Sequence, residues 1–102
     1  MKIESIRTML DSKAVKWSTH CLEKMAERDI NIEEVKSCIS NGEIIEDYPN
    51  DFPYPSCLIY GLGMDKRVIH VVVGSDGFSA YIITAYIPNT VKFEEDLKTR
   101  RK

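Results

Sequence analysis

Apolar positions in the first forty residues recur every three or four residues, which is the spacing of one face of an α-helix. A run of this kind starts at Ile3 and predicts a first helix that ends near Asp11. Ser18 is a favourable N-cap for a second helix, which we expect to stop near Arg28. Two amphipathic helices are therefore predicted before residue 30.

The third predicted helix has the clearest boundaries. Asn31 followed three residues later by Glu34 has the form of a capping box, in which each side chain satisfies a free backbone N–H of the first turn. The pair Asn41-Gly42 provides a C-terminal stop.

After Gly42 the pattern changes to short runs rich in β-branched and aromatic residues, separated by turn formers. These runs predict four antiparallel strands at 44–45, 56–62, 67–73 and 80–87. Pro88 ends the last strand, and Asn89 or Thr90 is expected to cap a short C-terminal helix. The expected fold class is α+β: N-terminal helices packed on a four-stranded antiparallel sheet, in a single domain over residues 1–102.

The turn between the last two strands decides which side chains meet. A three-residue loop over 75–77 pairs His70 with Ile82 and places His70 diagonal to Thr84, so that Tyr86 shares their face. A two-residue turn at Asp76-Gly77 instead shifts the strands and separates this cluster. In the first register the opposite face is expected to lie under the helices, and it carries Ile69, Val71, Val73, Tyr81, Ile83, Ala85 and Ile87.

Composition limits the classes of function. The chain has 14 Lys and Arg against 16 Asp and Glu, a net charge of -2, which argues against strong nonspecific binding to nucleic acid. Basic residues do gather near the C-terminus: Lys98, Arg100, Arg101 and Lys102. We prefer the interpretation that they stabilise a helix end over the alternative that they contact RNA.

The cysteines predict neither a disulfide framework nor a metal site. Cys21, Cys38 and Cys57 are odd in number, widely spaced and form no Cys-x-x-Cys pair. We expect reduced thiols, no metal or other cofactor, and a cytoplasmic location. No stretch is long and apolar enough to act as a membrane span, so no membrane partner is expected.

His20 and His70 are the only histidines, and histidine is the side chain whose pKa normally lies near working pH. Each candidate also has a purely structural interpretation. A histidine inside a strand is often held by a backbone carbonyl, as His70 can be, and His20 at the first turn of a helix can be a surface residue. Arg28 can cap carbonyls at the end of its own helix, and Thr84 and Tyr86 fit strand propensity without any function.

With these residues in view, the chain resembles the bacterial and phage family catalogued as domain of unknown function 4258. The family pattern begins with Ser-x-His at a helix start, continues through an Ile-Ile pair after a glycine, and ends with Ile-Thr-Ala-Tyr-x-Pro. The matching residues are Ser18, His20, Met25, Arg28, Asp29, Ile30, Gly42, Ile44, Ile45, Gly61, His70 and the stretch 83–88. In the C-terminal part, Phe93 replaces the family's Trp, while Asp96 and Arg100 are retained.

The resemblance implies a domain similar in fold to the RelE-type and barnase-type ribonuclease toxins of toxin-antitoxin systems. Residues of this sequence that match the family pattern and can do chemistry are His20, Arg28, His70, Thr84 and Tyr86. Because one fold hosts many activities, this likeness is an analogy and does not fix the function.

Two functions are therefore predicted. The first is a metal-independent endoribonuclease with His20, His70 and Thr84 as catalytic residues. One histidine takes the proton of a ribose 2′-hydroxyl and the other protonates the leaving oxygen. Arg28 or Arg67 stabilises the phosphorane charge, and Thr84 and Tyr86 orient the phosphate or stack a base. We expect His20, His70 and Thr84 to line one open cleft, with Arg28 or Tyr86 at its rim.

The alternative is a non-catalytic binding or regulatory module with a toxin-like fold. Its expected partner is a protein, either antitoxin-like or regulatory, whereas the first hypothesis expects RNA. The loop over residues 48–55, with Phe52 and Tyr54, is the candidate contact surface of this module.

Overall fold

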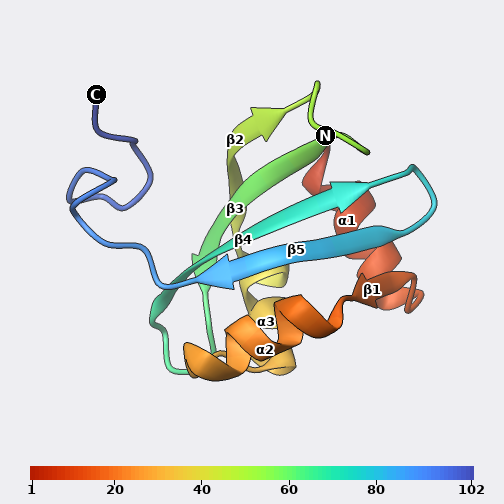
Figure 1. Ribbon diagram of the computed structural model, residues 1–102, viewed down its shortest axis with the longest axis horizontal. Coiled ribbons are helices and arrows are strands. Elements are labelled where there is room, and N and C mark those ends of the chain that lie inside the picture. Colours follow the sequence, from red (N-terminus) through yellow and green to blue (C-terminus); the bar gives the residue numbers. More distant parts are fainter.

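A computed structural model describes residues 1–102, and it contains three helices and one five-stranded sheet. The helices are α1 (Ile3–Asp11), α2 (Thr19–Glu27) and α3 (Ile32–Asn41). The strands are β1 (Val15–Trp17), β2 (Glu43–Tyr48), β3 (Ser56–Leu62), β4 (Val68–Ser75) and β5 (Ala80–Tyr86). Figure 1 shows the helices on one side of the sheet and the C-terminal segment, residues 87–102, on the other. No helix is both long and apolar enough to cross a membrane.

The three predicted helices are confirmed, and local capping signals fix the starts of α2 and α3. The Ser18 side chain accepts a hydrogen bond from the Cys21 N–H at 3.0 Å, which fixes the start of α2. Asn31 and Glu34 form the predicted capping box at the start of α3. These signals act within one turn of helix, so they can be interpreted without the rest of the fold.

The predicted four-stranded antiparallel sheet is only partly correct. The strand order is β1-β5-β4-β3-β2, and β1 runs parallel to β5 while the other pairs are antiparallel. A strand of three residues is too short to show an alternating pattern, so β1 was not predicted from the sequence. Its pairing covers only residues 80–82 of β5, and the rest of that edge stays open to other partners.

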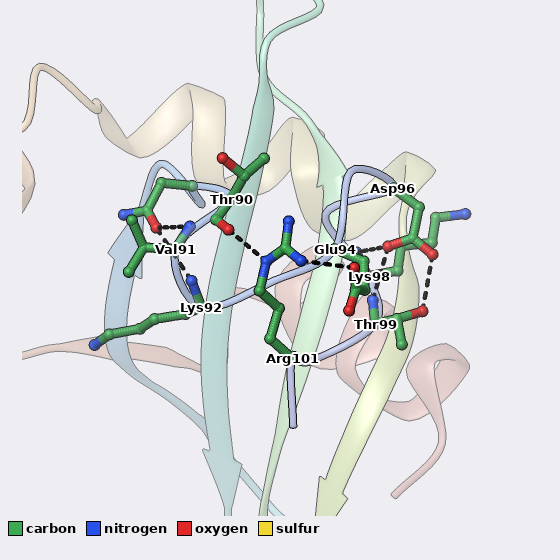
Figure 2. A network of polar contacts seen from close by, with 9 residues as sticks. Thr90, Val91, Lys92, Glu94, Asp96, Lys98, Thr99 and Arg101 are labelled. Atoms are coloured by element: carbon green, nitrogen blue, oxygen red, sulfur yellow. Dashed lines mark hydrogen bonds and ion pairs between the residues drawn. The ribbon is translucent and has the colours of Figure 1, made fainter.

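The predicted C-terminal helix is wrong, because side chains compete there for the backbone donors that a helix requires. The side-chain Oδ1 of Asn89 accepts hydrogen bonds from the N–H groups of Val91 and Lys92. The Asp96 carboxylate makes the same kind of turn further on, and Leu97 has a left-handed backbone with φ 58°. Figure 2 shows this irregular segment lying across the strands, with helices behind them.

The predicted register of the last hairpin is wrong, because its loop is longer than expected and β5 contains a β-bulge. Ser75 pairs with Ala80, so the connecting loop spans 76–79 and not 75–77. Ile83 is the extra residue of the bulge, since its neighbours Ile82 and Thr84 pair with consecutive residues of β4. His70 consequently lies opposite Tyr86 and not opposite Ile82.

The longer loop reverses the predicted faces in the first half of β5, and the bulge restores them from Thr84 onward. Ile82 belongs to the buried core, whereas Ile83, expected under the helices, is 46% exposed on the opposite surface. Tyr81 likewise pairs with Gly74 on that surface. We call the side of the sheet that packs against the helices the helical face, and the other side the outer face. Ile69, Val71 and Ala85 lie in the core of the helical face, as predicted.

Candidate functional site

A cleft opens where the end of α2, the end of β5 and the start of the C-terminal segment meet. Its volume is about 350 Å³. Every charged side chain that lines it is a cation, so we call it the cationic cleft. Its lining residues are Arg28, Tyr86, Ile87, Pro88, Asn89, Lys92, Phe93 and Arg100.

Arg28 is held in place by the open edge of β5. Its Nη1 donates to the Thr84 hydroxyl at 3.1 Å and to the Ala85 carbonyl at 2.9 Å. The Arg28 side chain therefore does not cap its own helix. It contacts Thr84, which lies 56 residues further along the chain. Because only Nη1 is used in these bonds, Nε and Nη2 retain donors for a ligand.

His70 is fully buried beneath the cleft, on the outer face of the sheet. Its Nε2 lies 2.7 Å from the Leu97 carbonyl and its Nδ1 lies 3.2 Å from the Tyr86 hydroxyl. A carbonyl only accepts, so Nε2 carries the proton, and a neutral ring then accepts the Tyr86 proton at Nδ1. Burial favours this neutral form and lowers the pKa of His70.

Tyr86 connects the buried histidine to the cleft. Its hydroxyl proton is donated to His70, so its oxygen presents lone pairs to an incoming group. Burial raises the pKa of Tyr86, which keeps the phenol protonated at neutral pH. This tyrosine is thus arranged to accept a hydrogen bond from a ligand.

Arg100 and Phe93 form the wall of the cleft on the side of the C-terminal segment. The Arg100 guanidinium makes two hydrogen bonds of 3.0 Å to the Glu46 carboxylate and lies 4.7 Å from the Phe93 ring centroid. The Arg100 hydrogen bonds lower the pKa of Glu46. Phe93 in turn packs edge-on against His70, with ring centroids 4.7 Å apart.

The basic residues near the C-terminus differ in their partners. Lys98 pairs with Glu43 at 3.5 Å, and Arg101 pairs with Glu94 at 2.9 Å. The interpretation that they stabilise a helix end is wrong, since no helix forms there. Lys92 is exposed and makes no ion pair, so its ammonium is free to meet an anion.

The structure does not bring the two histidines together. His20 lies exposed in the first turn of α2, and its imidazole makes no hydrogen bond. His70 has no exposed surface and lies on the outer face, whereas α2 buries Cys21 and Met25 in the core of the helical face. The predicted cleft shared by His20, His70 and Thr84 is therefore wrong. Of the predicted set, Arg28, Thr84, Tyr86 and His70 are joined by hydrogen bonds or by pairing along β5.

Arg67 lies outside this group as well. Its Nε and Nη2 contact the two carboxylate oxygens of Glu34 at 3.0 and 2.8 Å, and Nη2 also contacts the Asp29 carbonyl. The Arg67 hydrogen bonds lower the pKa of the buried Glu34 carboxyl. The guanidinium is thus engaged between α3 and the start of β4, away from the cationic cleft.

Sequence analysis missed Lys92, and it gave Arg100 a role only in the less favoured interpretation that the C-terminal basic residues contact RNA. Both residues reach the cleft because the C-terminal segment is irregular and folds back over the sheet. The match of Arg100 to the family pattern was the feature of the sequence that could have indicated this part of the site.

Two other hollows are larger, but neither gathers cationic side chains as the cationic cleft does. One of about 650 Å³ lies beside α1 and includes the Asp47 carboxylate, which pairs with the N-terminal amine at 3.2 Å. Another of about 520 Å³ lies between α2 and the start of α3. No group of three or more His, Cys, Asp or Glu side chains is arranged to hold a metal ion.

Comparison with known proteins identifies the family. The family model described as domain of unknown function (DUF4258) matches residues 17–87. The chain belongs to this family. The match includes Arg28, His70 and Tyr86, and it ends before Lys92 and Arg100. No curated protein and no solved structure matched the chain. The likeness in fold to RelE-type and barnase-type toxins therefore stays a prediction.

Proposed function

We propose that this DUF4258 domain binds RNA and holds one phosphate group of the RNA in the cationic cleft. The observation that carries the proposal is the sign of the charge. Three cations and no acid line the cleft, although the whole chain has a net charge of -2. A local concentration of positive charge in an acidic protein attracts an anionic group to that place.

The donors of the cleft suit a phosphate. Arg28 is oriented by its two bonds to β5 and keeps two nitrogens free, and Lys92 adds a mobile point charge. Arg100 is the third cation, and part of its charge is balanced by Glu46. Guanidinium groups bind phosphate oxygens through paired, charge-assisted hydrogen bonds, which are about twice as strong as neutral ones.

Tyr86 favours RNA over DNA as the ligand. Its oxygen is an acceptor, because its proton is directed to His70. A phosphate has no proton to donate to it at neutral pH, whereas a ribose 2′-hydroxyl does. The 2′-hydroxyl is the group by which proteins distinguish RNA from DNA at a given position.

Fluorescence anisotropy with a labelled single-stranded RNA tests the proposal. Arg28→Gln and Lys92→Gln should each weaken binding about tenfold, and each should lower the slope of log affinity against log salt by roughly 0.7. Lys36→Gln is the matched control, because Lys36 is a half-exposed lysine on α3 paired with Glu33. Equal affinities for all three variants would exclude the cleft as the binding site.

A second candidate function is cleavage of the bound RNA, and the Tyr86–His70 hydrogen bond favours it. As the 2′-oxygen bonds to phosphorus, its proton passes to Tyr86 while the Tyr86 proton moves to Nδ1 of His70. The bond from phosphorus to the 5′-oxygen breaks, and Lys92 or water protonates that oxygen. The products are a 2′,3′-cyclic phosphate and a 5′-hydroxyl. This route replaces the predicted histidine pair.

The ends of the RNA products distinguish cleavage from binding. If the domain cleaves, Tyr86→Phe and His70→Gln should lower the rate at least roughly 10²-fold, as expected on loss of a general base. Their RNA affinity should change much less, and His20→Ala should cleave normally. RNA that stays intact with excess protein would leave the domain as a binding module.

A further inference from the structure

A second hollow on the outer face is apolar and aromatic, unlike the cationic cleft. It lies between the loop before β3 and the first half of β5 and has a volume of about 300 Å³. We call it the aromatic groove. It is lined by Phe52, Pro53, Tyr54, Gly74, Tyr81 and Ile83.

The aromatic rings of the groove are already arranged for stacking. Tyr54 and Tyr81 stack on each other, with centroids 5.2 Å apart and an interplanar angle of 18°. Phe52 is 90% exposed, so its ring contributes little to the fold and is available to a ligand. Gly74 keeps the floor open, since a Cβ there would lie 3.3 Å from the Ile83 side chain.

The β-bulge places the groove and the cationic cleft on one surface. Tyr81 and Tyr86 are five residues apart, a separation that puts side chains on opposite faces of a regular strand. With Ile83 as the extra residue, Tyr81 pairs with Gly74 and Tyr86 with His70, two residues of β4 that share a face. The four-residue separation on β4 corresponds to about 13 Å. Thr84, bonded to Arg28, lies between the two sites.

Charge continues along this surface. Lys16 pairs with Tyr81 in the sheet, and its ammonium lies 5.8 Å from the Tyr81 ring centroid. It makes no ion pair. The Asp76 carboxylate beside Tyr81 is engaged by the Tyr81 hydroxyl and by the N–H groups of Phe78 and Ser79. Cations thus flank the groove at Lys16 and at Arg28.

We propose that the aromatic groove is a base-stacking subsite for single-stranded RNA that runs along the outer face of β5. In this arrangement Phe52 and the Tyr54–Tyr81 pair stack an unpaired base, and the phosphates of the strand meet Lys16, Arg28 and Lys92. The inference rests on RNA binding at the cationic cleft and adds the form of RNA that is bound. Aromatic stacking and a basic track are the combination by which proteins hold single strands without reading their sequence.

RNA fits this surface better than a protein partner does. The groove is the size of a single flat group, and free cations lie on both sides of it. A protein interface of standard size buries about 800 Å² on each partner around an apolar centre. Here the apolar centre is confined to the six residues of the groove.

The test uses the full chain and an oligoadenylate of about eight nucleotides. Phe52→Ala and Tyr54→Ala should weaken binding about tenfold each, which is within the range for loss of one stacked base. Phe78→Ala is the matched control, because Phe78 is 85% exposed in the loop between β4 and β5 but does not line the groove. An adenine replaced by 2-aminopurine should lose fluorescence on binding to the natural chain and much less on binding to Phe52→Ala.

The outcomes separate this inference from the proposed function. If Arg28→Gln weakens binding while Phe52→Ala, Tyr54→Ala and Phe78→Ala all bind normally, the cleft holds RNA and the stacking subsite is excluded. If Arg28→Gln has no effect, the proposed function itself fails. A base-paired hairpin bound as tightly as the single strand, or self-association of the chain that Phe52→Ala abolishes, would also overturn the subsite.

Discussion

The two faces of the sheet are built in different ways. The helical face and α1, α2 and α3 together enclose a continuous apolar core of fifteen buried residues, most of them aliphatic. The outer face is covered at one end by the irregular C-terminal segment and contacted at the other by the loop before β3, and these contacts are aromatic and polar. Both faces arise from the same strands, because successive side chains point in opposite directions.

The helical face therefore provides most of the stability, and the outer face carries the polar groups that can bind a ligand. Aliphatic burial against helices supplies most of the free energy of folding, and it leaves no room for polar groups. The outer face tolerates a buried histidine because its two ring nitrogens both have partners. Arginine, tyrosine and lysine can therefore gather there without weakening the core.

The largest effect should come from the helical face. Ile69→Ala, in the centre of the sheet, should lower the free energy of unfolding by about 4 kcal/mol, since its surroundings cannot close the cavity. Ile83→Ala is the matched control on the outer face, where the side chain is 46% exposed, and it should cost less than about 1 kcal/mol. Denaturant unfolding measures both values, and equal losses would break the comparison.

The covered end of the outer face should behave as a small second core. Phe93→Ala should cost about 3 kcal/mol, because the ring is buried against His70 and beneath Arg100. Val91→Ala, two residues away and 80% exposed, should change stability by less than about 0.5 kcal/mol. A Phe93→Ala chain as stable as the natural one would show that the segment is not anchored to the sheet.

Stability should depend on pH through His70. Burial lowers its pKa in the folded chain, so below about pH 6.5 the unfolded chain binds more protons than the folded chain. The free energy of unfolding should therefore fall as the pH is lowered from 7, by about 1.4 kcal/mol for each unit by which the pKa is lowered.

The carboxyls with lowered pKa are those of Glu34, Glu46, Asp76 and Asp96. They lose their contribution only at lower pH, below their ordinary values of 4.5 for Glu and 3.8 for Asp. The two effects are thus separable by denaturant unfolding at a series of pH values. His70→Gln should flatten the curve between about pH 7 and pH 5. An unchanged curve in that variant would assign the dependence to another group.

The last comparison concerns the reactivity of thiols. It should show the smallest effect on stability but a clear contrast in accessibility. Cys21, Cys38 and Cys57 are buried in the core of the helical face, and burial raises the pKa of Cys38 to about 12 and of Cys57 to about 11. They should react with a thiol reagent only on unfolding. A cysteine introduced on the outer face by Ile83→Cys should react at once in the folded chain, and fast labelling of a native cysteine would contradict the burial.

Local signals made much of this protein predictable from its sequence. The capping residues Ser18 and Asn31 set the helix starts, and strand propensity indicated three of the strands closely. The family pattern also identified Arg28, His70 and Tyr86 as candidates. Each of these features depends on neighbours in sequence or on a short motif, so no knowledge of the distant chain is needed.

The tertiary structure alone decided how the site is assembled. The bulge at Ile83 puts Tyr81 and Tyr86 on one face, and only pairing with β4 reveals it. The C-terminal segment covers His70 because the Leu97 carbonyl meets its ring, a contact across 27 residues. Lys92 enters the cleft for the same reason. Composition and periodicity carry no information on such contacts, since their free energy arises between segments that are far apart in the sequence.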